Sequence, residues 1–339
     1  MEHLTVVAIA VAAALVGTAS ADDKPVVVTP DNFVRAETDM YFSKTVSDGG
    51  FGKLVHQREA PSIDHQTVVR MNRDTLYSSG VFDLDAGPVT ITLPNVGKRF
   101  MSLQVLSEDQ YTAEVSYAPG THTYDKSKIG TRYVFFIVRT LADPNSPKDM
   151  EAAHAAQDAI KVQQAAKGSF EVPKWDPISQ GKVRDALAEL GRLGASSEAA
   201  FGTKEQVSPL DYVVGAAVGW GGNPIYAAKY IMVNPKLNDG KTIYRLTVKD
   251  VPVDGFWSIS VYNANGFFEK NDLDAYSLNN LTAKANADGS YTVQFGGCSK
   301  TSQNCLPIAN GWNYAVRLYR ARKPLLDGTW TFPEAQPVQ

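Results

Sequence analysis

Hydrophobic and polar positions alternate along short segments in both halves of the chain, which predicts β-strands. In the first half these segments are 81–84, 89–93, 99–106, 111–117 and 132–139, with turn residues between them. In the second half they are 242–248, 256–262, 290–295 and 312–320. Strands that follow one another without intervening helices favour antiparallel sandwiches over a parallel, doubly wound sheet.

The middle of the chain has helical spacing instead. Residues 146–167 and 179–193 are rich in Ala, Glu, Gln, Lys and Leu, which predicts two helices. The stretch 212–224 has too much glycine for a clear helix prediction, and we interpret it as a tightly packed crossing or a loop. One more helix is predicted near the N-terminus, with Thr29 as its N-cap and Pro30 in its first turn.

Two strand patterns of the first half recur in the second half, in the same order. Phe100–Leu106 matches Phe256–Tyr262, and Tyr133–Arg139 matches Tyr314–Arg320. This repetition suggests paired β modules joined by the helical middle. The alternation places Leu103, Val105, Ile259 and Val261 toward the cores, and Ser258, Ser260 and Tyr262 on the opposite face. Such a face is normally solvated, and it becomes a site candidate only if the other module covers it.

The N-terminal residues look like an export signal. An apolar region at 4–17 is followed by Ala19–Ala21, so we expect removal of residues 1–21 and a mature protein that begins near Asp22. Glu2 and His3 stand where Lys or Arg is usual, which leaves an uncleaved anchor or a misassigned start open. No later segment is apolar over the ~20 residues that cross a bilayer. We therefore expect a periplasmic or secreted protein without membrane contact beyond the signal segment.

Charge and cysteine content narrow the class of protein further. The 339 residues carry a formal net charge of −3 without a basic cluster, so nucleic acid is not an expected partner. The two cysteines, Cys298 and Cys305, flank a short polar loop. In an exported protein we expect them to form a disulfide, which would stabilise the fold by roughly 2–3 kcal/mol.

Polar side chains are densest at Val68–Ser78. If this stretch is a strand, Arg70, Asn72 and Asp74 share one face and align a cation, an amide and a carboxylate. Such a row can bind a polar ligand in a cleft. It can equally cross-link a turn, because Arg–carboxylate pairs and Asp or Asn turn bonds are common structural devices.

Several motifs resemble a known family. Asn72–Ser78, Asp83–Leu84 and a Leu-Pro ending at Pro94 resemble the signature of a bacterial family catalogued as domain of unknown function 1254. Gly255–Asn263, Asp288–Ser290, Arg317–Arg320 and Leu326–Trp330 resemble its usual partner, domain of unknown function 1214. The resemblance covers most of the mature chain.

The resemblance implies a mainly β fold of two jelly-roll-like antiparallel β-sandwich modules with a helical connecting segment, and a function that is unassigned. Within this plan we place the signal peptide at 1–21, the N-terminal module at 22–145, the helical connecting segment at 146–240 and the C-terminal module at 241–339. The motif residues carried over as site candidates are Asn72, Arg73, Asp74, Thr75, Tyr77, Trp257, Tyr262, Arg317 and Tyr319. The chain departs from longer members in its short segment between the modules and in its Cys298–Cys305 loop.

Motifs of common hydrolases are missing from the sequence. There is no G-x-S-x-G elbow and no H-E-x-x-H helix. His56 and His65 flank the polar stretch, but their spacing matches no standard ligand pattern, so we predict no metal site and no cofactor. Asp74, Glu108 and Asp109 could form a general acid–base pair if the fold brings them together. Otherwise Glu108 and Asp109 are a solvated loop tip.

Two functional hypotheses remain. In the first, a polar-aromatic cleft between the modules binds a small polar molecule or sugar through Arg70, Asn72, Arg73, Thr75, Trp257, Tyr262, Arg317 and Tyr319. In the second, the protein is a periplasmic hydrolase or lyase that uses Asp74 as acid or base. Tyr77 or Tyr262 would donate a proton, and Arg70 or Arg317 would stabilise developing negative charge. A homo-oligomer is compatible with either hypothesis. A buried Asp74 with a shifted pKa beside a cleft would favour catalysis.

Overall fold

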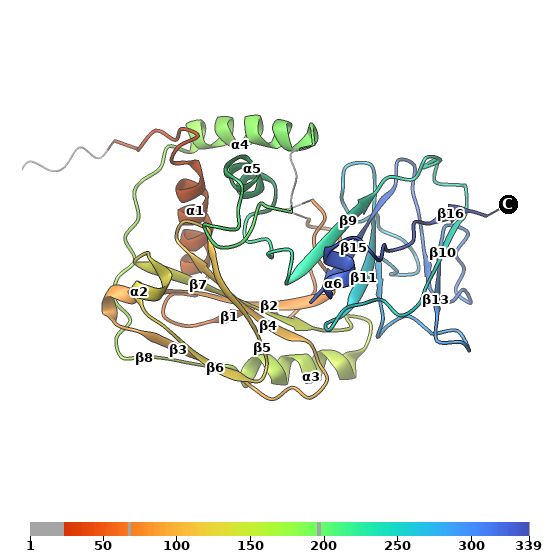
Figure 1. Cartoon of the computed structure of the whole chain (residues 1–339), viewed down its shortest axis with the longest axis horizontal. Helices are drawn as coiled ribbons and strands as arrows, with labels where there is room; N and C mark the ends of the chain where they lie inside the picture. Colours follow the sequence, from red (N-terminus) through yellow and green to blue (C-terminus); the bar gives the residue numbers. More distant parts are fainter. Residues whose placement is uncertain (1–23, 67–68, 195–197, 339) are drawn as a thin grey trace, which may run out of the picture.

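The N-terminal module is a sandwich of a five-stranded and a three-stranded sheet (Figure 1). The computed structural model describes residues 24–66, 69–194 and 198–338. The larger sheet has the order β1 (Val55–His56), β2 (Thr75–Asp83), β7 (Tyr133–Leu141), β4 (Met101–Ser107) and β5 (Thr112–Tyr117). The smaller sheet has the order β6 (Gly120–Tyr124), β3 (Val89–Leu93) and β8 (Lys161–Gln164). Alternate residues of β2, β3, β4 and β7 form the core between them, as the period-two pattern predicts.

Helices cover the other face of the five-stranded sheet. α1 (Phe33–Ser47), α4 (Pro177–Arg192) and α5 (Pro209–Gly219) pack together on this side (Figure 1). Phe42 of α1 contacts Phe135 of β7, with ring centroids 5.1 Å apart. The remaining elements of this module are η1 (Leu84–Ala86), α2 (Lys126–Ile129) and α3 (Pro147–Asp158).

The C-terminal module packs two four-stranded sheets face to face. One has the order β12 (Ser277–Asn279), β11 (Trp257–Tyr262), β15 (Asn313–Tyr319) and β9 (Ala228–Val233). The other has the order β14 (Cys305–Leu306), β13 (Tyr291–Phe295), β10 (Tyr244–Val248) and β16 (Gln336–Pro337). The short helix α6 (Lys323–Leu326) follows β15. Cys298 and Cys305 form the expected disulfide beside β14.

The mainly β fold and its antiparallel sheets are confirmed, but several predicted elements differ in detail. α1 begins at Phe33 with Asn32 at its N-cap, later than the predicted start at Thr29. The glycine-rich stretch does form a helix, α5, because Gly215 allows close packing: a Cβ there would lie 2.7 Å from Ala200 Cβ. The predicted connecting segment 146–240 also contains β8 and β9, which pair with the two modules.

The predicted signal peptide at 1–21 lies outside the described residues. Among residues 24–66, 69–194 and 198–338, no helix combines the length and the apolar composition that a membrane span requires.

The two modules meet along the outer face of the β12–β11–β15–β9 sheet. Aromatic rings close one part of this interface: Phe256 and Tyr319 stack at 4.2 Å, and Phe100 of the N-terminal module packs on Phe256 at 5.1 Å. The segment that precedes β2 crosses the rest of this sheet face. The face that alternation marked as the outer side of the second module is therefore covered by the first module.

Candidate functional site

The polar stretch before β2 is not a strand. β2 begins only at Thr75, and Arg70 has a φ of 53°, in the left-handed region. The expected row of Arg70, Asn72 and Asp74 on one face is therefore wrong, because strand alternation does not apply here. The Arg70 side chain is exposed, while its backbone N–H donates to the Gly266 carbonyl at 2.7 Å.

Arg317 holds this segment against the C-terminal sheet. Its guanidinium group is 4% exposed and donates to the carbonyl oxygen of Arg70 at 2.9 Å, to Ser260 Oγ at 2.8 Å and to the Tyr262 hydroxyl at 2.6 Å. Tyr262 in turn donates to the Met71 carbonyl at 2.9 Å. Both Nη1 and Nη2 donate to oxygen atoms, so this buried cation bridges the two modules through hydrogen bonds.

Burial and neighbouring groups act in opposite directions on Arg317. Burial alone would lower its pKa, but Tyr262, Tyr319 and Asp74 outweigh that effect and raise the pKa above its usual value. The guanidinium therefore remains charged within the interface.

Arg317, Ser260 and Tyr262 form a buried polar layer between the modules. Asp74 of the N-terminal module belongs to the same polar layer and is 2% exposed. The Ser258 hydroxyl donates to its Oδ2 at 2.6 Å, and the Ala142 N–H donates to its carbonyl oxygen at 3.0 Å. Burial raises the pKa of Asp74, and the charge of Arg317 and the side chains of Ser258 and Asn279 oppose that rise. Oδ1 is buried and accepts no hydrogen bond of good geometry from the described residues, although Asn279 is near enough to influence the pKa.

Asn72 links two of the three tyrosines of the predicted site, Tyr77 and Tyr319. Its Nδ2 lies 3.1 Å from Thr75 Oγ1, 3.2 Å from the Tyr77 hydroxyl and 3.1 Å from the Tyr319 hydroxyl. Burial would raise the pKa of Tyr77, but the charge of Arg139 and the nearby hydrogen bonds lower it. Burial raises the pKa of Tyr319 well above its usual value. The structure thus brings Asn72, Thr75, Tyr77 and Tyr319 together.

Sequence reasoning did not select Arg139 as a site residue. It donates to Gln104 Oε1 at 2.7 Å, to Asn223 Oδ1 at 3.2 Å and to the Gly221 carbonyl at 3.1 Å, and its guanidinium lies 5.5 Å from the centroid of the Tyr77 ring. Arg139 is the last residue of the pattern Tyr133–Arg139, which recurs in the second half of the sequence, and this repetition was the signal that could have identified it. β7 and β15 each carry a buried arginine, so the polar layer has one guanidinium from each module.

Two other predicted site residues lie apart from this layer. Trp257 points into the core of the C-terminal module, because it alternates with Ser258 along β11. Arg73 donates to the Pro61 carbonyl and lies 5.4 Å from the centroid of the Tyr276 ring. Trp257 is therefore a core residue, and Arg73 stabilises the neighbouring loop that contains Pro61.

The proposed pairing of Asp74 with Glu108 or Asp109 does not form. Thr75 pairs with Leu141 at one end of β7, whereas Glu108 follows β4 at the other end of the sheet. Glu108 is also not a solvated loop tip, because it is only 6% exposed.

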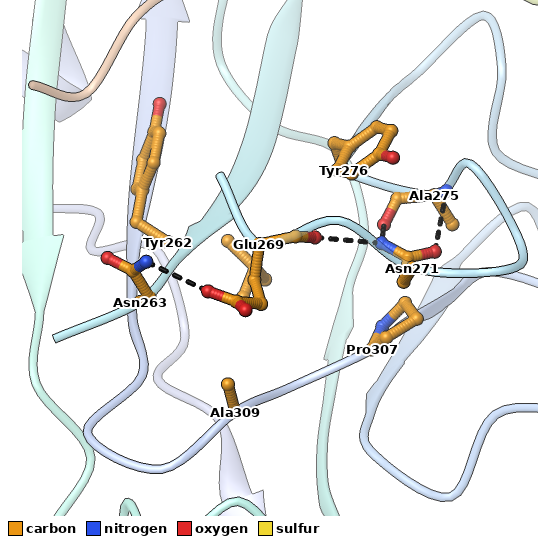
Figure 2. A pocket seen from close by; sticks show the side chains of 9 residues that line it. Tyr262, Asn263, Glu269, Asn271, Ala275, Tyr276, Pro307 and Ala309 are labelled. Carbon is orange, nitrogen blue, oxygen red and sulfur yellow. Dashed lines mark hydrogen bonds between the residues drawn. The ribbon is translucent and has the colours of Figure 1, made fainter. Parts of the chain in front are cut away.

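A small cavity lies behind Tyr262 (Figure 2). Asn263 Nδ2 donates to Glu269 Oε2 at 2.9 Å, and Asn271 Nδ2 donates to the Glu269 carbonyl at 3.3 Å. The Tyr262 hydroxyl points away from these groups. The cavity has a volume of ≈ 10 Å³, about that of one water position, so it is too small for a sugar.

A larger pocket of ≈ 230 Å³ opens between the two modules. The N-terminal module contributes the segment after β7 and the first turn of α3, and the C-terminal module contributes the turn after β12. The lining residues are Leu141, Ala142, Asp143, Ser146, Asp149, Asn279, Leu281 and Thr282.

The walls of this pocket are tied to the polar layer. Asn279 Oδ1 accepts from the N–H groups of Leu281 and Thr282 at 2.9 and 3.0 Å, which fixes the turn after β12. Asp149 is fixed by Arg99 Nη1 at 3.1 Å. Asp74 itself does not line the pocket. Two of its neighbours do: Ala142, whose N–H donates to the Asp74 carbonyl, and Asn279, whose side chain interacts with the Asp74 carboxyl.

Two solved structures share this fold. The VPA0106 protein from Vibrio parahaemolyticus matches with a TM-score of 0.67 at 18% identity, over 91% of this chain and 96% of that chain. An uncharacterised protein from Burkholderia cenocepacia matches with a TM-score of 0.51 at 15% identity, over 91% of this chain and 87% of that one. No curated protein matches the chain.

Family comparison assigns both halves of the chain. Residues 51–128 match the family described as protein of unknown function (DUF1254), and residues 225–323 match protein of unknown function (DUF1214). The second match begins before β9, in agreement with the pairing of β9 with β15. The chain therefore belongs to the family in which an N-terminal DUF1254 domain is paired with a C-terminal DUF1214 domain.

Proposed function

We propose that this protein is exported to the periplasm or secreted, and that it binds a small polar, carbohydrate-like ligand at the junction of its two β modules. The observation that carries the binding proposal is the ≈ 230 Å³ pocket lined by both modules. Ligand pockets are commonly concave sites between structural units, with a few polar groups among apolar ones. The predicted export signal at residues 1–21 and the disulfide support the location.

The chemistry of the pocket suits a ligand rich in hydrogen-bond donors. Two carboxylates, Asp143 and Asp149, and the Ser146 hydroxyl lie on one side, and the Asn279 amide lies on the other. Leu141 and Leu281 provide apolar surface for the carbon skeleton. The volume is below the usual range for drug-sized ligands, so a monosaccharide or a comparable polyol is the size class that we propose.

The residues of the buried polar layer support this pocket indirectly. Asp74, Tyr262 and Arg317 are each at most 4% exposed, and they connect the modules that form the two walls. The alternative hydrolase or lyase would need Asp74 to contact a substrate. Because Asp74 does not line the pocket, the geometry favours binding over catalysis.

A thermal-shift screen of the mature protein against monosaccharides, disaccharides and polyols tests the proposal. We expect at least one compound to raise the unfolding midpoint, since a ligand at 100-fold its Kd stabilises by about 2.7 kcal/mol. Leu281→Trp should abolish the shift, because the 65% exposed Leu281 lines the pocket and a larger ring would fill it. Leu237→Trp, at a 55% exposed position that does not line the pocket, is the matched control.

Two outcomes would count against this proposal. One is the absence of any shift across the panel. The other is a shift that Leu281→Trp leaves unchanged, which would place the ligand elsewhere. Mass spectrometry of the exported protein tests the location separately, with a mature chain that begins near Asp22 as the expected result.

A further inference from the structure

A buried group of carboxyl side chains joins α1 to the turn between β4 and β5. Asp39 of α1 is 0% exposed, and Glu108 of the turn is 6% exposed. Trp175 Nε1 donates to Asp39 Oδ2 at 2.8 Å. Arg35 Nη1 lies 3.2 Å from Glu108 Oε1, and its Nε donates to Asp109 Oδ1 at 3.0 Å. One guanidinium group therefore faces three carboxyl groups.

The second carboxyl oxygen of Asp39 lacks an ordinary donor. Oδ1 is buried and accepts no hydrogen bond from an N–H or O–H group of the described residues. The carboxyl of Glu108 interacts with the Asp39 side chain as a hydrogen-bond partner. Two carboxylates are both acceptors, so they can bond to each other only if one of them carries a proton.

A proton on Asp39 satisfies every group in this cluster. Asp39 then donates to Glu108 and still accepts from Trp175 through its other oxygen. Glu108 stays ionised and keeps its contact with Arg35. Without that proton, two buried negative charges would face each other across the contact between α1 and the turn.

We propose that Asp39 and Glu108 share one proton, and that this proton is a pH-dependent latch between α1 and the turn that joins β4 to β5. The latch is closed when the proton is bound. Its loss weakens the attachment of α1 to the five-stranded sheet.

The surroundings set the pH range in which the latch opens. Burial, opposed by the hydrogen bond from Trp175, combines with the charge of Glu108 to raise the pKa of Asp39 to about 7. The other titratable groups that face the cluster are Asp109, the Glu37–Arg184 ion pair between α1 and α4, Tyr133 of β7, and Tyr212 of α5, which donates to the Asp109 carbonyl.

The sign of the effect follows from proton linkage. The folded state holds the proton up to about pH 7, whereas an unfolded aspartate loses it near its ordinary pKa of 3.8. The stabilisation is therefore complete below the unfolded pKa and is lost as the pH rises through the folded pKa. Between these two pKa values the unfolding equilibrium constant should rise by up to tenfold per pH unit, and above about pH 7 it should level off.

Asparagine and glutamine substitutions test the latch, because each supplies the missing donor permanently. Asn at position 39 can donate to Glu108 and accept from Trp175, and Gln at position 108 can donate to Asp39. We expect Asp39→Asn and Glu108→Gln each to flatten the pH dependence of the unfolding constant between about pH 5 and 7. Glu151→Gln removes an exposed helical carboxylate of α3 and should keep the wild-type dependence.

Hydrogen exchange gives a second measurement that locates the effect. After correction for intrinsic rates, wild-type amides of α1 should lose protection between about pH 5 and pH 7, and those of the Asp39→Asn variant should not. If both substitutions leave the wild-type pH dependence unchanged, or α1 keeps equal protection in the two proteins, the latch is refuted.

Discussion

Asp74 and Asp39 are both buried aspartates with a raised pKa, yet the protein accommodates them in different ways. At the module interface, Asp74 is approached by the Ser258 hydroxyl and by the charge of Arg317. Under α1, Asp39 is approached by a second acid, Glu108. The first carboxyl is stabilised by donors and a cation from another module, whereas the second must share a proton.

The comparison shows how one residue type acquires two roles. Donors that are fixed in place hold Asp74 and Arg317 as a permanent joint between the modules. A shared proton can leave when the pH changes, so the contact at Asp39 is conditional. Substitutions at Arg317, Asp74 and Arg70 test the permanent joint.

Arg317→Ala should cause the largest loss of unfolding free energy. It removes the donors for the Arg70 carbonyl, Ser260 and Tyr262, and it leaves Asp74 without its neighbouring cation. We expect the free energy of unfolding, measured by urea titration, to fall by about 3–5 kcal/mol. Arg245→Ala, on the exposed side of β10, is the control and should change it by less than about 0.5 kcal/mol. Equal losses in the two variants would show that Arg317 is an ordinary surface contact.

Substitutions at Asp74 should lower the free energy of unfolding by an intermediate amount, which depends on whether the new side chain keeps an acceptor oxygen. Asp74→Ala removes the acceptor of the Ser258 hydroxyl and should cost about 2–3 kcal/mol in urea unfolding. Asp74→Asn keeps an acceptor oxygen and removes the buried charge, so its cost should be about 1 kcal/mol or less. Equal losses for Asn and Ala would show that the charge itself, which both variants lack, holds the joint.

Arg70→Ala should have the smallest effect, although Arg70 lies in the same motif. The segment is held through the backbone N–H and carbonyl groups of Arg70, and its side chain is exposed. We expect a change within about 0.5 kcal/mol in the same titration. A loss close to that of Arg317→Ala would mean that the Arg70 side chain is part of the joint after all.

Period-two alternation predicted most strands, and it also predicted the faces of β11. Ser258, Ser260 and Tyr262 lie on one face, as expected, because side-chain direction in a strand follows from local geometry. Alternation could not describe the segment before β2. The positive φ of Arg70 is imposed by contacts with the other module, which are far away in the sequence.

The remaining features depend on residues that only the fold brings together. Arg139 meets Asn223 across 84 positions, and Asp39 meets Glu108 between α1 and a β turn. No spacing rule joins such pairs. The glycines of α5 suggested a break, yet Gly215 serves close packing against Ala200. Sequence alone therefore predicted elements and candidate residues, but neither the closure of the polar layer nor the position of the pocket.

The central claim is that the polar layer around Asp74 and Arg317 joins the two modules into one cooperative unit. Hydrogen exchange during a urea titration, followed separately for peptides of β7 and β13, tests it most directly. We predict coincident midpoints for the two modules in the wild-type protein and separate midpoints in Arg317→Ala. Separate midpoints in the wild-type protein, or coincident and unshifted midpoints in the variant, would contradict this account.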